Sequence, residues 1–406
     1  MVTRTRLALA AATVAFACAS GACVVVFGMD PLSEKAGATD SGPSDAGTSD
    51  ANDADFVDAC GVDDIGAIGK PEPTASPSDA GSLYFAFTLL DLGIDGNAER
   101  PGHDLDRRVT VDRGTSSCTF MEGTDTALQY GADTPAGVDN VTFGLLQALR
   151  GFVAAFDPVR FNGRLVDSIY GVVVRLDRWN GAENDDDVSV FVFPTIGYWR
   201  KAADGGLVAG GERSAPFNPD AGHLWVPDAR FRAGTIGSSI SSDAAWINGG
   251  KLVARFGRMT LPLRSSVDEL RSFDIELRDA WMTATLAPEA GTLSDGTISG
   301  RIPSGAFLEQ VKLMYDESSG SYVCAKVQDN LGLLCAARDI RASHCDDGRG
   351  SPCDALSFGA RFEAQRAGEL GPFRARTDDE YRAAGQLPPS ERCADAGDLA
   401  PIDCPR

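Results

Sequence analysis

The chain has 406 residues and a formal net charge of −21 at pH 7, from 58 acidic and 37 basic side chains. A surface this acidic repels nucleic acid and anionic lipid headgroups, which excludes both as partners. It suits divalent cations, cationic proteins and neutral ligands. The globular part begins near residue 83 and exceeds 300 residues, so we expect two subdomains or one large sandwich.

The first 22 residues have the order of a secretory signal peptide. Two arginines come first, an uncharged apolar run follows, and small residues lead up to Cys23, with Cys18 as a weaker candidate acceptor for a lipid. This order is typical of export. Two alternatives stay open. One is cleavage with release of the chain, for example after Ala19. The other is an uncleaved anchor, because residues 7–27 carry no charge and are long enough to cross an apolar layer of about 30 Å as a helix.

Residues 23–81 are predicted to be a low-complexity acidic linker. Between residues 30 and 59 the chain holds eight acids and one lysine, interleaved with Ser, Gly, Ala and Thr. Such a stretch buries too little apolar surface to offset chain entropy, and like charges extend it further. The segment 71–81 continues the same composition.

Together, Cys23, the acidic linker and a cysteine-containing globular domain resemble the uncharacterised surface lipoproteins of myxobacteria. Residues 103–106 (HDLD), 137–140 (GVDN) and 353–357 (CDALS) are similar to recurring patches in those proteins. The resemblance implies a diacylglyceryl group on Cys23 and attachment to the cell envelope or the outer-membrane surface. Free secretion is the alternative, and the resemblance brings no activity with it.

Residues 82–320 are predicted to form a mainly β domain with a β-sandwich-like core and a few short helices. Apolar and β-branched runs alternate with Gly, Pro and Asp breaks. Residues 83–90 read as a buried strand, and 169–176 with 188–193 read as a hairpin. Residues 273–277 alternate apolar and acidic side chains, which is typical of a half-buried strand, and 282–286 continue it. Residues 297–302 form a further candidate strand.

Two helices are predicted from apolar residues at three- and four-residue spacing. The first covers 141–156, with Asp139 and Asn140 where an N-cap belongs. The second follows Ser304 as its cap and extends to about residue 314. Core packing explains both apolar faces.

The remaining region, 321–406, is predicted to be cysteine-rich and to pack on the β domain. An even number of cysteines in an exported chain indicates disulfides, each contributing about 2–4 kcal/mol. We expect one bridge between Cys60 and Cys118 and three among the C-terminal six. A zinc site at His344, Cys345 and Cys353 is an alternative, but no tight paired spacing supports it. The eight cysteines are Cys60, Cys118, Cys324, Cys335, Cys345, Cys353, Cys393 and Cys404.

Acidic loops in an exported β protein are suited to calcium, which takes six to eight oxygen ligands. The spacing does not match an EF-hand loop, and Asp also makes turns and caps. Bound calcium is therefore a hypothesis here, and no other cofactor is expected. The candidate ligands are Asp91, Asp95, Asp104, Asp106, Asp139, Asp185 and Asp187.

Trp179 precedes an Asn-Gly turn and an acidic run, so it is a candidate for stacking on a glycan, although most tryptophans of a large β domain are buried. The chain contains three histidines and no motif for nucleophilic, metal-dependent or dinucleotide chemistry. We therefore expect a structural or ligand-binding protein, with a glycan or an envelope protein as partner, rather than an enzyme. A secreted carbohydrate-active hydrolase that uses two carboxylates is the alternative.

Overall fold

The computed structural model describes part of the chain, and all described residues belong to the unit Asn52–Arg406. The predicted signal peptide, Cys23, most of the predicted linker, Cys60 and Asp95 lie outside the described residues. The described residues are 68–73, 81–93, 100–121, 125–149, 158–167, 170–204, 206–209, 223–231, 240–242, 244–264, 272–287, 291–316, 321–324, 327–328, 331–348, 350–375, 377–383, 391, 393 and 404.

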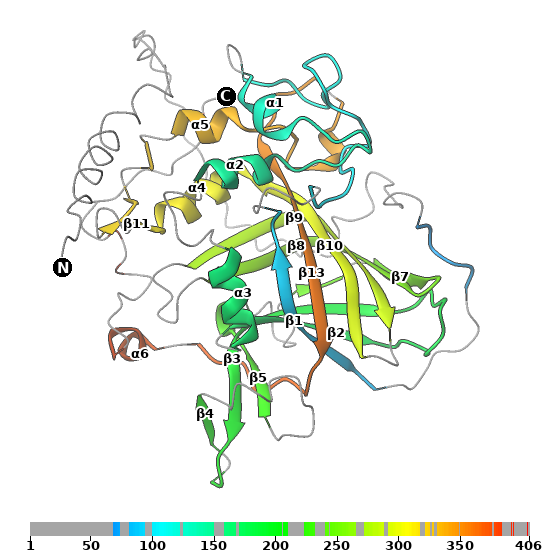
Figure 1. Cartoon of the computed structure of the whole chain (residues 1–406), viewed down its shortest axis with the longest axis vertical. Helices are drawn as coiled ribbons and strands as arrows, with labels where there is room; N and C mark the ends of the chain where they lie inside the picture. Colours follow the sequence, from blue (N-terminus) through cyan, green and yellow to red (C-terminus); the bar gives the residue numbers. More distant parts are fainter. Residues whose placement is uncertain are drawn as a thin grey trace, which may run out of the picture. The chain divides into compact units, whose positions relative to one another are not determined.

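The fold is mainly β, as predicted, and its centre is one eleven-stranded antiparallel sheet (Figure 1). The strands follow in the order β4-β3-β2-β1-β13-β10-β9-β8-β7, and β5 and β6 also pair with β3. A separate two-stranded sheet joins β11 and β12. The strands of the large sheet are β1 (Leu83–Asp91), β2 (Gly171–Asp177), β3 (Ser189–Lys201), β4 (Leu207–Ala209), β5 (His223–Pro227), β6 (Ile240–Ser241), β7 (Ala244–Asn248), β8 (Lys251–Arg264), β9 (Ser272–Ala287), β10 (Thr292–Pro303) and β13 (Ala355–Arg366); β11 is Tyr315–Asp316 and β12 is Ser321–Tyr322.

The region after residue 320 does more than pack on the sheet. Its strand β13 lies between β1 and β10, in the middle of the strand order. The predicted strand at 83–90 is confirmed as β1, and the predicted hairpin is confirmed as the antiparallel pair β2 and β3. Strand β1 thus hydrogen-bonds to β13, although most of the described chain lies between them in sequence. The sheet therefore joins the beginning and the end of the domain.

One face of the sheet is lined by the main hydrophobic core. Alternate residues point into it, such as Phe85 and Phe87 on β1 and Val172 and Val174 on β2, as the period of a strand requires. The opposite face, which we call the outer face, carries a smaller cluster around Trp225. The loop before β3 also reaches β7, because the backbones of Asp185 and Ile247 exchange two hydrogen bonds of 2.9 and 2.7 Å.

Strand β9 is one long strand that changes its inward-facing register at Asp279. Phe273, Ile275 and Leu277 point into the core before it, and Ala280 and Met282 do so after it. Asp279 has a φ of 44°, and the pairing with β10 shifts at the same place. Such a bulge redirects a side chain, and here it leaves the Asp279 carboxylate on the outer face next to β10.

Short helices cover one end of the sheet, where α1, α2, α4 and α5 gather (Figure 1). Helix α2 confirms the first part of the predicted helix, and residues 150–157 lie outside the described residues. Asn140 caps it by accepting a hydrogen bond of 3.0 Å from the Phe143 N–H. The helices are α1 (Thr126–Gly131), α2 (Val141–Leu149), α3 (Pro158–Val166), α4 (Ser304–Lys312), α5 (Leu331–Ala336) and α6 (Asp378–Ala383), with 3-10 turns η3 (Ala229–Phe231) and η5 (His344–Asp346).

The predicted cap of the second helix is wrong. Helix α4 begins at Ser304 itself, and the cap residue is Pro303, which has no side-chain hydrogen bond to give. The Ser304 N–H instead donates to the Asp354 carbonyl beside β13, at 3.0 Å, so a neighbouring segment satisfies the first turn. Among the described residues, no helix combines the length and apolar character that crossing a membrane requires.

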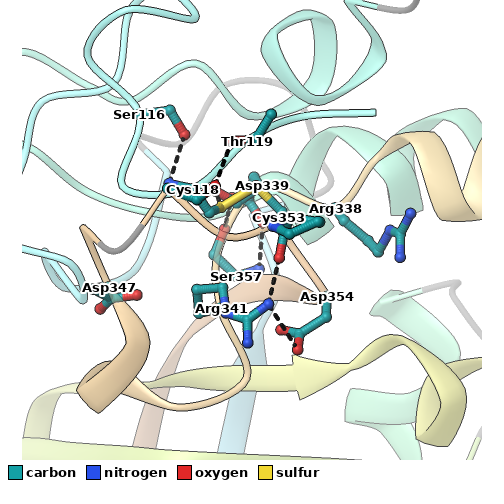
Figure 2. Close-up of a disulfide and its surroundings, with 12 residues drawn as sticks. Ser116, Cys118, Thr119, Arg338, Asp339, Arg341, Asp347, Cys353, Asp354 and Ser357 are labelled. Atoms are coloured by element: carbon teal, nitrogen blue, oxygen red, sulfur yellow. Dashed lines mark hydrogen bonds and ion pairs between the residues drawn. A yellow bond between two sulfur atoms is a disulfide. The ribbon is translucent and has the colours of Figure 1, made fainter. Parts of the chain in front are cut away.

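Three disulfides join pairs of described residues: Cys118–Cys353, Cys324–Cys393 and Cys335–Cys404. The predicted Cys60–Cys118 bridge is therefore wrong, and so is the prediction of three bridges among the C-terminal six. Cys118 pairs with Cys353 because the Thr119 backbone forms hydrogen bonds of 2.9 Å with Ser351 and Cys353, which brings the two cysteine Cα atoms to 5.1 Å (Figure 2). These bridges indicate an oxidising, extracytoplasmic environment.

The zinc alternative also fails. Cys353 is bonded to Cys118, and Cys345 is disulfide-bonded as well, so neither sulfur is available as a thiolate ligand. The cysteines therefore fix the chain covalently and leave metal binding to oxygen ligands.

His103 gives the stability of the fold a defined pH dependence. Its ring lies between two hydroxyls, with Nδ1 2.5 Å from Ser299 Oγ and Nε2 3.1 Å from Thr283 Oγ1, and burial lowers its pKa from 6.5 to about 4. The unfolded chain takes up a proton near pH 6.5 and the folded chain only near pH 4. This part of the stability is thus complete above pH 6.5 and lost as the pH falls, by about 3 kcal/mol at pH 4.

We predict that His103→Gln lacks this loss. Urea unfolding of both chains at several pH values between 7 and 4 measures it, and the difference in free energy of unfolding between native and variant should shrink steadily toward pH 4. If both chains lose stability in parallel across this window, the ring does not titrate as described.

Candidate functional site

The candidate site lies on the outer face of the sheet, where the segment 100–106 crosses β13. The crossing is close: a Cβ atom on Gly359 would lie 2.1 Å from the Pro101 carbonyl oxygen, so only glycine fits there. The Asn140 amide holds the crossing by donating to the carbonyls of Pro101 and Gly359, at 2.7 and 3.1 Å. One fully buried side chain thus joins the segment, helix α2 and strand β13.

This crossing brings three of the predicted calcium ligands together. Asp104, Asp106 and Asp139 each offer a carboxylate oxygen, and these oxygens lie within 4.8 Å of one another. Two oxygens on one calcium ion, each at about 2.3–2.6 Å, are at most about 5 Å apart, so the spacing fits a shared ion. Asp106 and Asp139 are buried, and Asp104 is partly buried.

Backbone N–H groups fix the orientation of these carboxylates. The Arg108 N–H donates to Asp104 Oδ1 and Asp106 Oδ1, at 3.2 and 2.9 Å, and the Leu105 N–H donates to Asp139 Oδ2 at 2.5 Å. Gly137 has a φ of 78°, and a Cβ atom there would lie 2.8 Å from Asp104 Oδ2. Glycine therefore allows the turn before Asp139 to approach Asp104. Secondary hydrogen bonds of this kind hold ligands in place around metal ions.

Two further acids act on the triad through their charges: Asp339, which is buried, and Asp133, which is partly buried. Burial raises the pKa of Asp133 to about 7, and burial together with the charges of Asp106 and Asp133 raises the pKa of Asp139 well above its usual value. Burial, and then the charge of Asp106, also raises the pKa of Asp104. Burial raises the pKa of Asp339 to about 7, although Ser357 donates two hydrogen bonds to it.

We call Asp104, Asp106, Asp133, Asp139 and Asp339 the acidic cluster. Arginine charges also act on it. Arg100 acts on Asp133 and Asp339, Arg301 acts on Asp139, and Arg107 acts on Asp104. Arg301 is already engaged by Asp347, at 2.6 and 2.9 Å. The cluster therefore holds more negative than positive charge away from bulk water, which favours proton uptake or the binding of a cation.

Arg301 connects the acidic cluster to the rest of the site. Its side chain is 1 % exposed, and besides the pair with Asp347 it donates to the carbonyls of Leu105 and Arg341, at 2.7 and 2.9 Å. Asp279, on the β9 bulge, lies 4.0 Å from it. Burial alone raises the pKa of Asp279, but hydrogen bonds from the His344 ring and backbone outweigh it and lower the pKa.

The other predicted calcium ligands lie in separate loops. Asp91 Oδ1 accepts a hydrogen bond from the Gly93 N–H at 2.7 Å. Asp185 is buried and accepts from the N–H groups of Asn180 and Asp187, at 2.7 and 3.1 Å, so it organises its own turn. Asp187 is exposed and forms an ion pair with Arg178 at 2.9 Å. Within the described part of the chain, these acids do not join Asp104, Asp106 and Asp139.

Trp179 is partly buried and packs against the main core. Its indole N–H donates to the Ala182 carbonyl at 2.9 Å, so the side chain closes the turn in which it lies. Core packing and this hydrogen bond account for the tryptophan, and glycan stacking by it stays a prediction.

Asp133, Asp339 and Arg301 were not identified from the sequence. Asp133 ends the turn after α1, and Asp339 follows the apolar helix α5, which are ordinary positions for an acid. Among 58 acidic residues, no local pattern marks these two. Arg301 lies in a predicted strand where a charged residue ordinarily faces water. Only the crossing segments above it explain its burial.

Two groups of side chains resemble a nucleophilic active site, but neither supports nucleophilic catalysis. Asp279 Oδ2 lies 2.8 Å from His344 Nδ1, and His344 Nε2 lies 3.8 Å from Cys345 Sγ, but Cys345 is disulfide-bonded and has no thiolate. Ser357 donates to Asp339, but its side chain is fully buried and has no histidine among its hydrogen-bond partners. The chemistry of this region is therefore that of carboxylates and guanidinium groups.

A comparison of the chain with models of protein families, with curated proteins and with solved structures finds no match in any of the three.

We predict that Arg301→Met lowers the free energy of unfolding by about 3–5 kcal/mol, because it removes a fully buried guanidinium group and leaves the Asp347 carboxylate and the Leu105 carbonyl, both partly buried, without their donor. Urea unfolding measures the loss. The matched control is Arg258→Met, whose pair with Glu276 is exposed and should contribute no more than about 1 kcal/mol.

Changing Asp347 to Asn in the Arg301→Met background should recover part of the loss, since the unpaired buried charge is then removed. Equal stability of Arg301→Met and Arg258→Met would contradict a central structural role for this guanidinium group.

Proposed function

We propose that the protein is an exported, lipid-anchored component of the cell envelope whose β-rich domain binds calcium in the acidic cluster and serves a structural or ligand-binding role. The order of the N-terminal residues supports export and an anchor at Cys23. The disulfides support an environment outside the reducing cytoplasm.

A single observation carries the calcium proposal: Asp104, Asp106 and Asp139, from two separate segments, offer oxygens within 4.8 Å of one another. Three carboxylates can supply between three and six of the oxygens that calcium requires. A divalent ion also offsets the mutual repulsion that, after burial, raises the pKa of Asp139. Protonation relieves the same repulsion, so the two outcomes have to be separated by experiment.

The hydrolase alternative has less support. A glycosidase places two carboxyl groups about 5–10 Å apart on either side of a sugar that enters between them. In the acidic cluster, the Asp106 and Asp139 carboxylates are buried and turned toward backbone N–H groups. Calcium binding or a structural role does not require that a sugar can enter between the two carboxyl groups.

Thermal unfolding in calcium and in chelator tests the cation site. Binding to the folded chain alone adds about 2.7 kcal/mol at a hundredfold excess over the Kd, so the native protein should melt higher in calcium. Asp104→Asn should lose most of this gain. In chelator it should melt no lower than the native protein, because it removes one of several repelling charges.

Asp187→Asn is the matched control, since the Asp187 carboxylate is exposed and paired with Arg178, and it should keep the full calcium effect. A native chain with the same Tm in calcium and in chelator would rule out the structural ion.

Labelling with radioactive palmitate tests the anchor. The native chain, expressed in a bacterium with lipoprotein processing, should incorporate label and partition with membranes, whereas Cys23→Ala should do neither. Cys18→Ala is the control and should behave as the native chain does. Equal labelling of the native chain and Cys23→Ala would remove Cys23 as the site of acylation.

A further inference from the structure

We propose that a second site, a pocket beside the Cys118–Cys353 disulfide, binds a small anionic group, either a carboxylate or a sulfate or phosphate ester. The pocket has a volume of about 270 Å³ and lies between the segment 108–120 and the turn at Gly348 and Gly350. This volume is below the range of about 300–1,000 Å³ that drug-sized ligands occupy, so it suits one small group.

The charge of the wall gives the class of ligand. Arg108 and Arg113 line the pocket, and none of the lining residues that the structure describes is acidic, although acids outnumber bases by 58 to 37 in the chain. A guanidinium group presents a planar set of donors that matches a carboxylate or a phosphate. Two of them in one pocket of an otherwise acidic protein form a local positive site.

Arg108 is held weakly enough to accept a ligand. Its Nη1 lies 3.4 Å from the Ser116 carbonyl, which is a long hydrogen bond. Arg113 has an ion pair with Asp125 at 3.0 Å, and both side chains are exposed, where water and salt screen such pairs. An anion beside Arg108 replaces a long hydrogen bond with a charge-assisted one, and the charge of Arg113 adds to the attraction.

Ser117 forms part of the pocket wall, but its hydroxyl does not face the cavity. The residue is 2 % exposed, and its hydroxyl oxygen is buried without a hydrogen-bond partner among the described residues. The hydroxyl therefore lies behind the surface that an anion touches, and the guanidinium groups provide the binding.

The glycine turn on the opposite wall makes room for the ligand-binding side chain. Gly348 has a φ of 75°, and a Cβ atom there would lie 3.1 Å from Arg108 Nη2. Its N–H donates to the Ser117 carbonyl at 2.7 Å, and Thr119 Oγ1 donates to the Gly350 carbonyl at 3.1 Å. The Cys118–Cys353 disulfide, which Figure 2 shows, links the segment 108–120 to the chain just after Gly350 and so limits the separation of the two walls. The pocket is thus formed in advance of binding.

The anion pocket does not require the calcium site, although Arg108 belongs to both regions. Its guanidinium group lines the pocket, whereas its backbone N–H donates to Asp104 and Asp106. A change of the Arg108 side chain therefore leaves those backbone contacts in place. The two proposals can fail separately.

Titration calorimetry tests the pocket in calcium-free buffer at constant ionic strength. The probes are sodium glucuronate for a sugar carboxylate, and inorganic sulfate and inorganic phosphate for the esters. At least one probe should bind saturably with one site per chain, and the probe that binds most tightly identifies the source of the anion. Binding of none of them at tens of millimolar would overturn the proposal.

Three variants locate the site. Arg108→Gln should weaken binding about tenfold or more, while Arg107→Gln, the exposed neighbour that does not line the pocket, should bind as the native chain does. Ser117→Ala is a second control: its buried hydroxyl does not face the cavity, so the variant should bind as the native chain does, and without anion its Tm should be no lower, because the lost hydroxyl had no partner among the described residues. Equal effects of Arg107→Gln and Arg108→Gln would show general charge attraction and overturn the pocket.

Discussion

The site depends on one buried cation. Arg301 projects from β10 to the outer face of the sheet, where its two Nη atoms donate four hydrogen bonds to the Asp347 carboxylate and the carbonyls of Leu105 and Arg341. Burial alone lowers the pKa of Arg301, but the hydrogen bonds and charge of Asp347 outweigh it, so the group stays charged. A buried ion pair gives little net stability, yet an unpaired one is costly. The two crossing segments are therefore held to this one position.

From this arrangement follow two regions of opposite charge on one scaffold. The segment through Leu105 carries Asp104 and Asp106, and the segment through Asp347 continues to the glycine turn of the pocket. The Cys118–Cys353 disulfide joins the same two segments covalently, with Asp339 directly behind it, where Cys118 Sγ lies 3.3 Å from the Asp339 carbonyl (Figure 2). Charge and covalent bond thus restrain the same loops, together with a small hydrophobic cluster of Phe120, Ala127 and the two bonded cysteines.

The sequence predicted what depends on local pattern. Alternation and turn residues identified β1, the β2–β3 hairpin and both halves of β9, because each strand buries one face or both. Asn140 was recognised as a cap, since capping needs only the next turn of helix. The disulfide partners were not predicted, because Cys118 and Cys353 are 235 residues apart and meet only through the pairing of Thr119 with the segment before β13. The bulge at Asp279 was not predicted either, because it too depends on the pairing of β9 with neighbouring strands and not on local pattern.

The acidic cluster shows where composition fails as a guide. The sequence did not distinguish between the seven aspartates that were candidate calcium ligands. Within the described residues, only Asp104, Asp106 and Asp139 lie close enough together to share an ion. What separates them from Asp187 is desolvation: Asp187 turns to Arg178 at the surface, whereas Asp139 lies beneath the segment that crosses Gly359. That crossing requires the absence of a Cβ atom at Gly359, and nothing in a sequence with 45 glycines indicates which of them another segment crosses. The backbone fold places the aspartates of the acidic cluster close together although their charges repel one another. A cation that binds there reduces this repulsion, and its binding is more favourable for that reason.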